Sequence, residues 1–98
     1  MAKIIWTKKG LKWFTQVHEY ISERSPVSAD KVVSDIYDRI QSLRKHPRLG
    51  QRFEKITDRE VRIILYGHYR IAYLIRNEDR IEILGVFHSA MDIDRHLK

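Results

Sequence analysis

The stretch VRIILYGHYRIAYLIR, residues 61–76, decides the predicted fold. Apolar side chains recur in it at alternate positions, which is typical of β-strands with a buried face. Gly67 and His68 interrupt the alternation, so the sequence predicts two antiparallel strands joined by a tight turn. A third strand is expected over 80–87, after a turn at 77–79, because its end ILGVF is apolar enough for a strand covered on both faces.

The alternation also predicts which side chains of the first two strands share a face. We expect Val61, Ile63 and Leu65 to pack beneath the helices, which directs Arg62 to the opposite face. Arg70 comes just after the tight turn, where the backbone holds it rigidly and close to solvent. Its contact could be an acidic protein, a phosphate or an acidic group within the fold, and the alternation does not choose among them.

Two amphipathic helices are predicted before these strands. A short strand over 2–6 leads to Thr7, whose hydroxyl suits the N-cap of a helix over 8–24. Ser25 and Pro26 are typical of the start of a second helix, and the short connection predicts an antiparallel hairpin. The apolar stripes comprise Leu11, Trp13, Phe14, Val17, His18, Tyr20 and Ile21 in the first helix and Val32, Val33, Ile36, Tyr37, Ile40 and Leu43 in the second.

Together these elements predict an α+β fold in a single domain, residues 1–98. The predicted order is an N-terminal strand, an antiparallel helical hairpin, three consecutive antiparallel strands forming one sheet, and a short C-terminal helix or tail. The hairpin should pack on one face of the sheet. The side chains expected to be largely buried are Trp13, Phe14, Val33, Ile36, Ile40, Ile63, Tyr73, Ile83 and Val86.

The composition limits the possible cellular locations and the kinds of chemical site. The chain has 98 residues, a formal net charge of +6 and no cysteine, which excludes disulfides, zinc–thiolate sites and a cysteine nucleophile. No apolar run reaches the roughly 20 residues that a membrane-spanning helix needs, and the polar residues 7–9 do not resemble a signal peptide. A cytoplasmic protein without membrane contact is therefore expected. Its positive charge is typical of a domain that meets nucleic acid or an acidic protein.

The five histidines do not suggest a metal site, because they are scattered over a helix, a loop, a turn and the C-terminus. None forms the helical i, i+4 pair with a glutamate that metalloproteases use, and no glycine-rich phosphate loop is found. We therefore expect no metal and no cofactor. Metal-free acid–base chemistry would need cations and a proton carrier on one surface, which Arg62, Arg70 and His88 could assemble. A solvated basic face without chemistry is the alternative.

Four stretches carry a resemblance to a known family: IIWTKKGLKWFTQVHEYI (4–21), SLRKHPRLGQRF (42–53), VRIILYGHYRIAYLI (61–75) and IEILGVFHSAMD (81–92). In their order and spacing they resemble the RelE/ParE superfamily, the toxins of type II toxin–antitoxin systems, over nearly the whole chain. The sharpest marks are HPRLG after the second helix, YRIAY on a strand and VFH at the end of the last strand. The resemblance implies a compact sheet with a helical hairpin, in agreement with the fold predicted above.

The resemblance implies one of two targets. RelE-like toxins cleave mRNA in the ribosomal A site, and Arg62, Arg70 and His88 match positions of their basic and acid–base machinery. ParE-like toxins share the fold, serve in plasmid stabilization and are described as DNA gyrase inhibitors without nuclease activity.

The departures from the RelE pattern favour a ParE-like gyrase inhibitor that is not an enzyme. Ile64, Ser89 and Ala90 stand where a RelE-like nuclease would carry cations, and residues 89–98 contain no tyrosine. Loss of cations that balance charge in a phosphoryl transition state should lower the rate by orders of magnitude. The residues expected to contact the target are Arg62, Arg70, His88, Arg95, His96 and Lys98.

The resemblance also implies an acidic antitoxin encoded beside this chain. The net charge of +6 would speed encounter with it, and an exposed apolar groove between hairpin and sheet should supply the affinity. Residues 88–98 are expected to pack poorly and to reach the target, so truncation after Phe87 should abolish toxicity and leave the groove intact. Two alternatives stay open: a ribosome-dependent mRNA endonuclease of RelE type, and a non-toxic binding module that keeps the fold.

Overall fold

The computed structural model describes residues 1–89, 91 and 93–97 of the chain. Its elements are the strand β1 (Lys3–Trp6), the helices α1 (Lys8–Ser22) and α2 (Pro26–Gln41), the 3-10 helix η1 (Ser42–Arg44), the strands β2 (Gln51–Arg52), β3 (Glu60–Tyr66), β4 (Tyr69–Asn77) and β5 (Arg80–His88), and the short helix α3 (Asp94–Leu97). The α+β class and the predicted order are confirmed, and β2 is an additional strand, too short to show a period. None of the described helices is long and apolar enough to cross a membrane.

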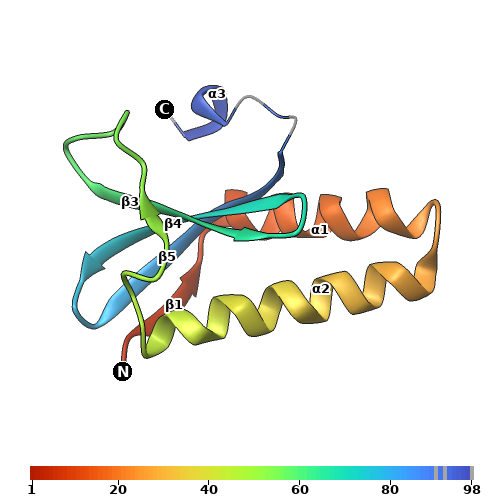
Figure 1. Ribbon diagram of the computed structural model, residues 1–98, viewed down its shortest axis with the longest axis horizontal. Coiled ribbons are helices and arrows are strands. Elements are labelled where there is room, and N and C mark those ends of the chain that lie inside the picture. The colour runs from red at the N-terminus through yellow and green to blue at the C-terminus, as the bar shows by residue number, and fades with distance from the viewer. Residues whose placement is uncertain (90, 92, 98) are drawn as a thin grey trace.

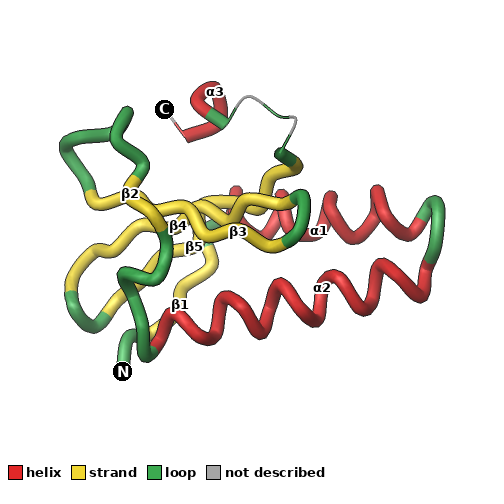
Figure 2. Tube along the Cα trace, viewed as in Figure 1, coloured by secondary structure: helices red, strands yellow, loops and turns green. Residues whose placement is uncertain are grey.

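The described strands form a five-stranded sheet in the order β1-β5-β4-β3-β2. β3, β4 and β5 are antiparallel, as predicted, and β2 continues this pattern at one edge. β1 forms the other edge and pairs parallel with β5. The helices α1 and α2 lie antiparallel to each other along one face of the sheet, and α3 lies on the opposite side (Figure 1, Figure 2).

The hydroxyl of Thr7 both starts α1 and attaches it to the sheet. Its Oγ1 accepts a hydrogen bond from the amide of Gly10 at 2.9 Å and donates one to the carbonyl of Ile83 at 2.8 Å. Gly10 permits this close approach, because a Cβ there would collide with the Ile83 carbonyl. Ser25 caps α2 in the same manner, so both predicted N-caps are confirmed.

Apolar side chains cover both faces of the sheet in two clusters. The helix-side core lies between the sheet and the α1–α2 hairpin, and its buried members are Ala2, Val17, Ile36, Ile40, Leu43, Ile64, Ile71, Tyr73, Ile75, Ile81, Ile83 and Val86. The C-terminal-side core lies on the other face, and its buried members are Ile56, Val61, Ala72, Leu74, Phe87, Ile93 and Leu97. The central strands β4 and β5 are therefore apolar on both faces, as the ILGVF stretch predicted.

The face predicted for β3 is wrong. Ile64 belongs to the helix-side core and Tyr66 packs against that core, whereas Val61 and Ile63 pack in the C-terminal-side core. Leu65, which was expected beneath the helices, is 61% exposed. Both faces of β3 carry apolar side chains, so the two-residue period identified a strand without identifying its inner face.

The predicted core is confirmed at its centre and is more open at its rim. The fully buried members are Ile36, Ile40, Tyr73, Ile83 and Val86. The half-buried members are Trp13, Phe14, Val33 and Ile63. Leu11, Tyr20 and Tyr37 are about half exposed, because the predicted helical stripes are wider than the surface that the sheet covers.

The chain beyond β5 packs on the sheet, so the expectation that it packs poorly is wrong for its described residues. Ile93 is 4% exposed and Leu97 is 8% exposed, and both belong to the C-terminal-side core. The two residues are four positions apart, and one helical turn brings such a pair to the same face. An amphipathic pattern of a single turn is too short to be distinguished by periodicity in the sequence.

Candidate functional site

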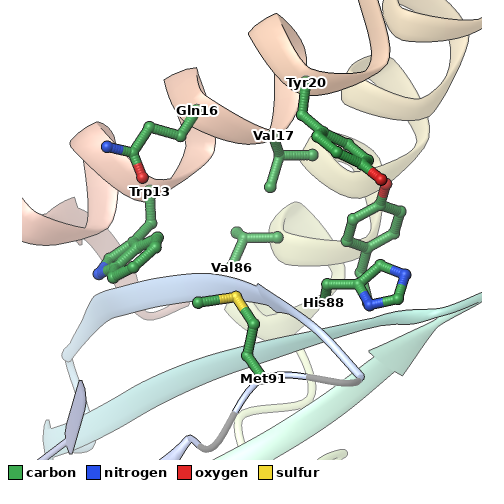
Figure 3. Close-up of a pocket in the computed structure, with 8 residues that line it drawn as sticks. Trp13, Gln16, Val17, Tyr20, Val86, His88 and Met91 are labelled. Atoms are coloured by element: carbon green, nitrogen blue, oxygen red, sulfur yellow. The ribbon is translucent and has the colours of Figure 1, made fainter. Parts of the chain in front are cut away.

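An apolar groove lies between α1 and the sheet, where a groove between the hairpin and the sheet was predicted. Its volume is about 370 Å³, and its lining residues are Trp13, Gln16, Val17, Tyr20, Tyr69, Val86, His88 and Met91. Figure 3 shows the α1 side chains on one side of the groove, opposite Val86 and His88, with Met91 reaching toward Val86. The groove is thus bounded by α1, by the sheet and by the chain that follows β5.

Aromatic rings and the cation of Arg24 border this groove. The rings of Tyr69 and His88 meet edge to face with centroids 5.6 Å apart, and the rings of His68 and His88 are 6.3 Å apart. The guanidinium of Arg24 lies 4.7 Å from the centre of the Tyr20 ring, a cation–π contact. Burial raises the pKa of Tyr69 above its ordinary value, so its phenol stays neutral at physiological pH. An apolar interior with a basic, aromatic border suits a segment that carries both apolar and acidic side chains.

The predicted cation cluster is not assembled, because Arg62 and Arg70 lie on opposite faces of the sheet. Arg62 pairs in register with Tyr73, which belongs to the helix-side core. Arg70 pairs with Leu65 on one neighbouring strand and with Phe87 on the other, and Phe87 belongs to the C-terminal-side core. Directly paired residues project from the same face, so the sheet itself separates the two guanidinium groups.

Arg62 is bound within the fold. Its Nε lies 2.8 Å from a carboxylate oxygen of Glu60, and its Nη1 donates to the carbonyl of Gly50 at 2.7 Å. The Nε of Arg48 lies 3.1 Å from the same carboxylate oxygen. The hydrogen bond from Arg62 is the main cause that lowers the pKa of Glu60 below its ordinary value. Since 18% of the Arg62 side chain is exposed, this residue chiefly fastens the segment before β2 to β3.

Arg70 is bound to the backbone of its own chain. Its Nη2 donates to the carbonyl oxygen of Met91 at 2.8 Å and lies 3.5 Å from that of Ser89. The Nε of Arg70 is buried and has no hydrogen-bond partner among the described residues. In place of an acidic group or a phosphate, the arginine therefore holds the chain beyond β5 against the sheet.

The other predicted site residues lie toward the C-terminus. His88 ends β5 and lines the apolar groove on the helix side of the sheet. Arg95 is exposed on α3. Ala90, Lys98 and the side chain of His96 lie outside the described residues. Within the described part of the chain, histidine and acidic side chains form no group of three that could hold a metal ion.

Comparison with known proteins identifies the family of this chain. Residues 4–93 match the ParE toxin family, the ParE toxin of type II toxin–antitoxin systems, parDE. The chain belongs to the ParE toxin family. This membership confirms the resemblance to the RelE/ParE superfamily and its ParE-like branch.

Two known proteins match this ParE-family toxin over most of their length. Toxin RelE2 of Caulobacter vibrioides is 28% identical over 90 residues, which cover 92% of this chain and 98% of the relative. A solved structure described as the chromosomal ParDE TA system from P. aeruginosa has a TM-score of 0.72 at 19% identity, covering 90% of this chain and 96% of the solved chain. At 19% identity, the match to the solved structure shows a shared fold.

Three residues that line the groove of this ParE-family toxin, Gln16, Tyr69 and Met91, were not predicted individually. Tyr69 faces the helix-side core because it stands two positions before Ile71, and the strand period could have indicated that. Met91 stands in a segment without periodicity. Its place in the groove is therefore visible in the tertiary structure alone.

Proposed function

We propose that this ParE-family toxin inhibits DNA gyrase and does not cleave mRNA. The observation that carries the proposal is the placement of Arg62 and Arg70 on opposite faces of the sheet. Cleavage of a phosphodiester needs cations gathered around one phosphate, with an acid–base group beside them. Two guanidinium groups that the sheet separates cannot bind the same phosphate.

The strand position that would supply a further cation to a RelE-like nuclease is also unsuitable. Ile64 is buried in the helix-side core, so its side chain does not meet solvent. Arg62 and Arg70 already donate hydrogen bonds within the fold, and a substrate would have to replace them. Of the two targets that the resemblance implies, gyrase is therefore better supported.

The basic end of the chain is the proposed contact with the target. Leu97 and the preceding Ile93 attach this part of the chain to the sheet and leave Arg95 exposed. His96 and Lys98 add basic residues in the same stretch of sequence. A short basic segment of this kind suits an acidic protein surface or the DNA that gyrase holds.

We also infer that the apolar groove receives a segment of an acidic antitoxin. The net charge of +6 favours encounter with an acidic partner. Tyr20 lines the groove and is 49% exposed. Exposed aromatic side chains of this kind are frequent anchors of protein interfaces. Binding of an apolar side chain against the Tyr20 ring would remove this apolar surface from water.

The target is tested with purified toxin and purified gyrase. We expect supercoiling of relaxed plasmid to fall with increasing toxin, while ribosome-bound mRNA stays intact. Arg95→Ala should weaken the inhibition, and Arg44→Ala, at another exposed arginine, should not. Codon-specific cleavage of ribosome-bound mRNA that Arg70→Ala abolishes would support the RelE-type endonuclease instead. Absence of both activities and of growth arrest on induction would support the non-toxic binding module.

The antitoxin groove is tested with a matched pair of tyrosines. Tyr20 lines the groove, and Tyr37 has nearly the same exposure, 48%, on the surface of α2 outside it. Tyr20→Ala should weaken binding of the protein encoded by the adjacent gene about tenfold or more, as is usual for an aromatic anchor, and Tyr37→Ala should leave it unchanged. Equal effects of the two changes would place the antitoxin elsewhere.

A further inference from the structure

We propose that Arg70 is a positioning residue that shapes the antitoxin groove, although its side chain lies on the other face of the sheet. Arg70 holds the main chain of the segment that follows β5, and the side chain of Met91 in that segment lines the groove. The inference rests on the proposed function of the groove. It assigns to this arginine a role in partner binding that needs no contact with the partner.

Hydrogen bonds at three points hold the segment after β5 in place. Arg70 Nη2 lies 2.8 Å from the carbonyl oxygen of Met91 and 3.5 Å from that of Ser89. The amide of Ser89 donates to the carbonyl of His68 at 2.7 Å, and the amide of Met91 donates to that of His88 at 2.9 Å. The chain therefore turns just after β5 and is fixed both to the β3–β4 turn and to Arg70.

The contact from Arg70 is the charged one among these hydrogen bonds. A charge-assisted hydrogen bond is roughly twice as strong as a neutral one. The rigid guanidinium also presents several donors at once, which a single ammonium group does not. Its Nε is buried without a partner among the described residues, which costs free energy. The contacts of Nη2 with the carbonyl oxygens of Ser89 and Met91 offset this cost.

Met91 also packs against the C-terminal-side core, but the direction of its side chain in the groove depends on its backbone. Methionine is unbranched and has three rotatable side-chain bonds, so the side chain does not hold one conformation by itself. Figure 3 shows Met91 directed toward Val86, across the groove from α1. Release of its carbonyl from Arg70 would let the segment move away, and the groove would lose one wall.

The test combines hydrogen exchange of the free toxin with antitoxin binding. In Arg70→Gln we expect faster exchange at the amides of Ser89 and Met91, with exchange in α1 and α2 unchanged. Affinity for the purified product of the adjacent gene should fall about tenfold, the size expected on losing a charge-assisted hydrogen bond. Arg76→Gln is the matched control, because Arg76 lies on the same strand and contacts the side chain of Glu82. It should change neither measurement.

A double-mutant cycle separates positioning from a general loss of stability. If Arg70 acts through Met91, Arg70→Gln should cost little further affinity once Met91→Ala is present. Additive losses, or unchanged exchange at Ser89 and Met91, would overturn the inference. Should Arg70→Gln fail to fold, Arg70→Lys serves in its place, with faster exchange at Ser89 and Met91 than in the wild type and an affinity between those of the wild type and Met91→Ala. Wild-type values in both measurements would count against the inference.

Failure of the proposed groove can be recognised independently. If Tyr20→Ala leaves antitoxin affinity unchanged, the groove is not the binding site and the proposed function fails there. The exchange measurement needs no antitoxin. It would then still support or overturn the control of the segment after β5 by Arg70.

Discussion

The hydroxyl of Tyr73 joins two points of one loop: its oxygen lies 2.9 Å from the amide nitrogen of Gly50 and 2.7 Å from the carbonyl oxygen of Pro47. Tyr73 is fully buried on β4, so a core side chain fixes the HPRLG stretch that leads to β2. Arg62 holds the carbonyl of Gly50 from the neighbouring strand. The loop is thus positioned by the polar ends of two strand side chains.

Tyr73→Phe removes this hydroxyl and leaves the ring. We expect the free energy of unfolding to fall by about 1–3 kcal/mol, because a buried amide and a carbonyl lose their partner. Urea unfolding measures the loss, and Tyr37→Phe, at an exposed tyrosine, should change stability by less than about 0.5 kcal/mol. Equal stability of the two variants would show that water replaces the Tyr73 hydroxyl without cost.

A second polar contact predicts how stability depends on pH. Tyr66 Oη donates to Asp35 Oδ2 at 2.6 Å, and Lys31 Nζ lies 3.0 Å from the same oxygen. Hydrogen bonding by Tyr66, and then by Lys31, lowers the pKa of Asp35 below its ordinary 3.8. The hydrogen bond to Asp35 in turn raises the pKa of Tyr66 above its ordinary 10.0. These groups link α2 to β3.

The direction in which stability changes with pH follows from these two pKa shifts. A lowered carboxyl pKa contributes stability above about pH 4 that is lost as the pH falls through the folded-state value. A raised phenol pKa contributes stability below about pH 10 that is lost as the pH rises through the folded-state value. We therefore expect Tyr66→Phe to be less stable than the wild type near neutral pH, with a difference that shrinks at both extremes. Chemical unfolding at a series of pH values tests this, and a pH-independent difference would contradict it.

Ile36→Ala tests the face assigned to α2. Ile36 is fully buried in the helix-side core, so the change should cost about 2–5 kcal/mol of unfolding free energy. Its neighbour Tyr37 points outward, and Tyr37→Ala should have little effect on urea unfolding. A loss below about 1 kcal/mol for Ile36→Ala would mean that the helix face is assigned wrongly.

The C-terminal residues divide into structural and exposed ones. Truncation after Phe87 would remove His88 and Met91 from the groove and uncover the C-terminal-side core, so the expectation that it spares the groove is wrong. Single substitutions distinguish the structural residues from the exposed ones better than truncation does. Ile93→Ala should lower stability by about 2 kcal/mol or more, whereas Arg95→Ala should not alter the thermal midpoint. If Arg95→Ala destabilised the fold as much as Ile93→Ala, its effect on gyrase could not be assigned to target contact.

The sequence by itself determined the helices, the three long strands, the N-caps at Thr7 and Ser25, and the family. These features depend on spacing of a few residues, which the chain shows directly. The tight turn at 67–68 also determines the pairing register of β3 and β4. Pairing across a two-residue turn places Arg62 opposite Tyr73 and Arg70 opposite Leu65, and this register already puts the two arginines on opposite faces.

Only the tertiary structure decided which face of β3 is inward, because apolar residues on both faces satisfy the same alternation. It also decided the partner of Arg70. The carbonyl of Met91 lies 21 residues further along the chain, in a segment without a period that packs through Ile93 and Leu97. A contact of that kind depends on how the chain folds back over the finished sheet. Local sequence patterns do not determine where such a segment packs. The contact between Arg70 and Met91, and the groove wall that we infer from it, could therefore not be predicted from the sequence.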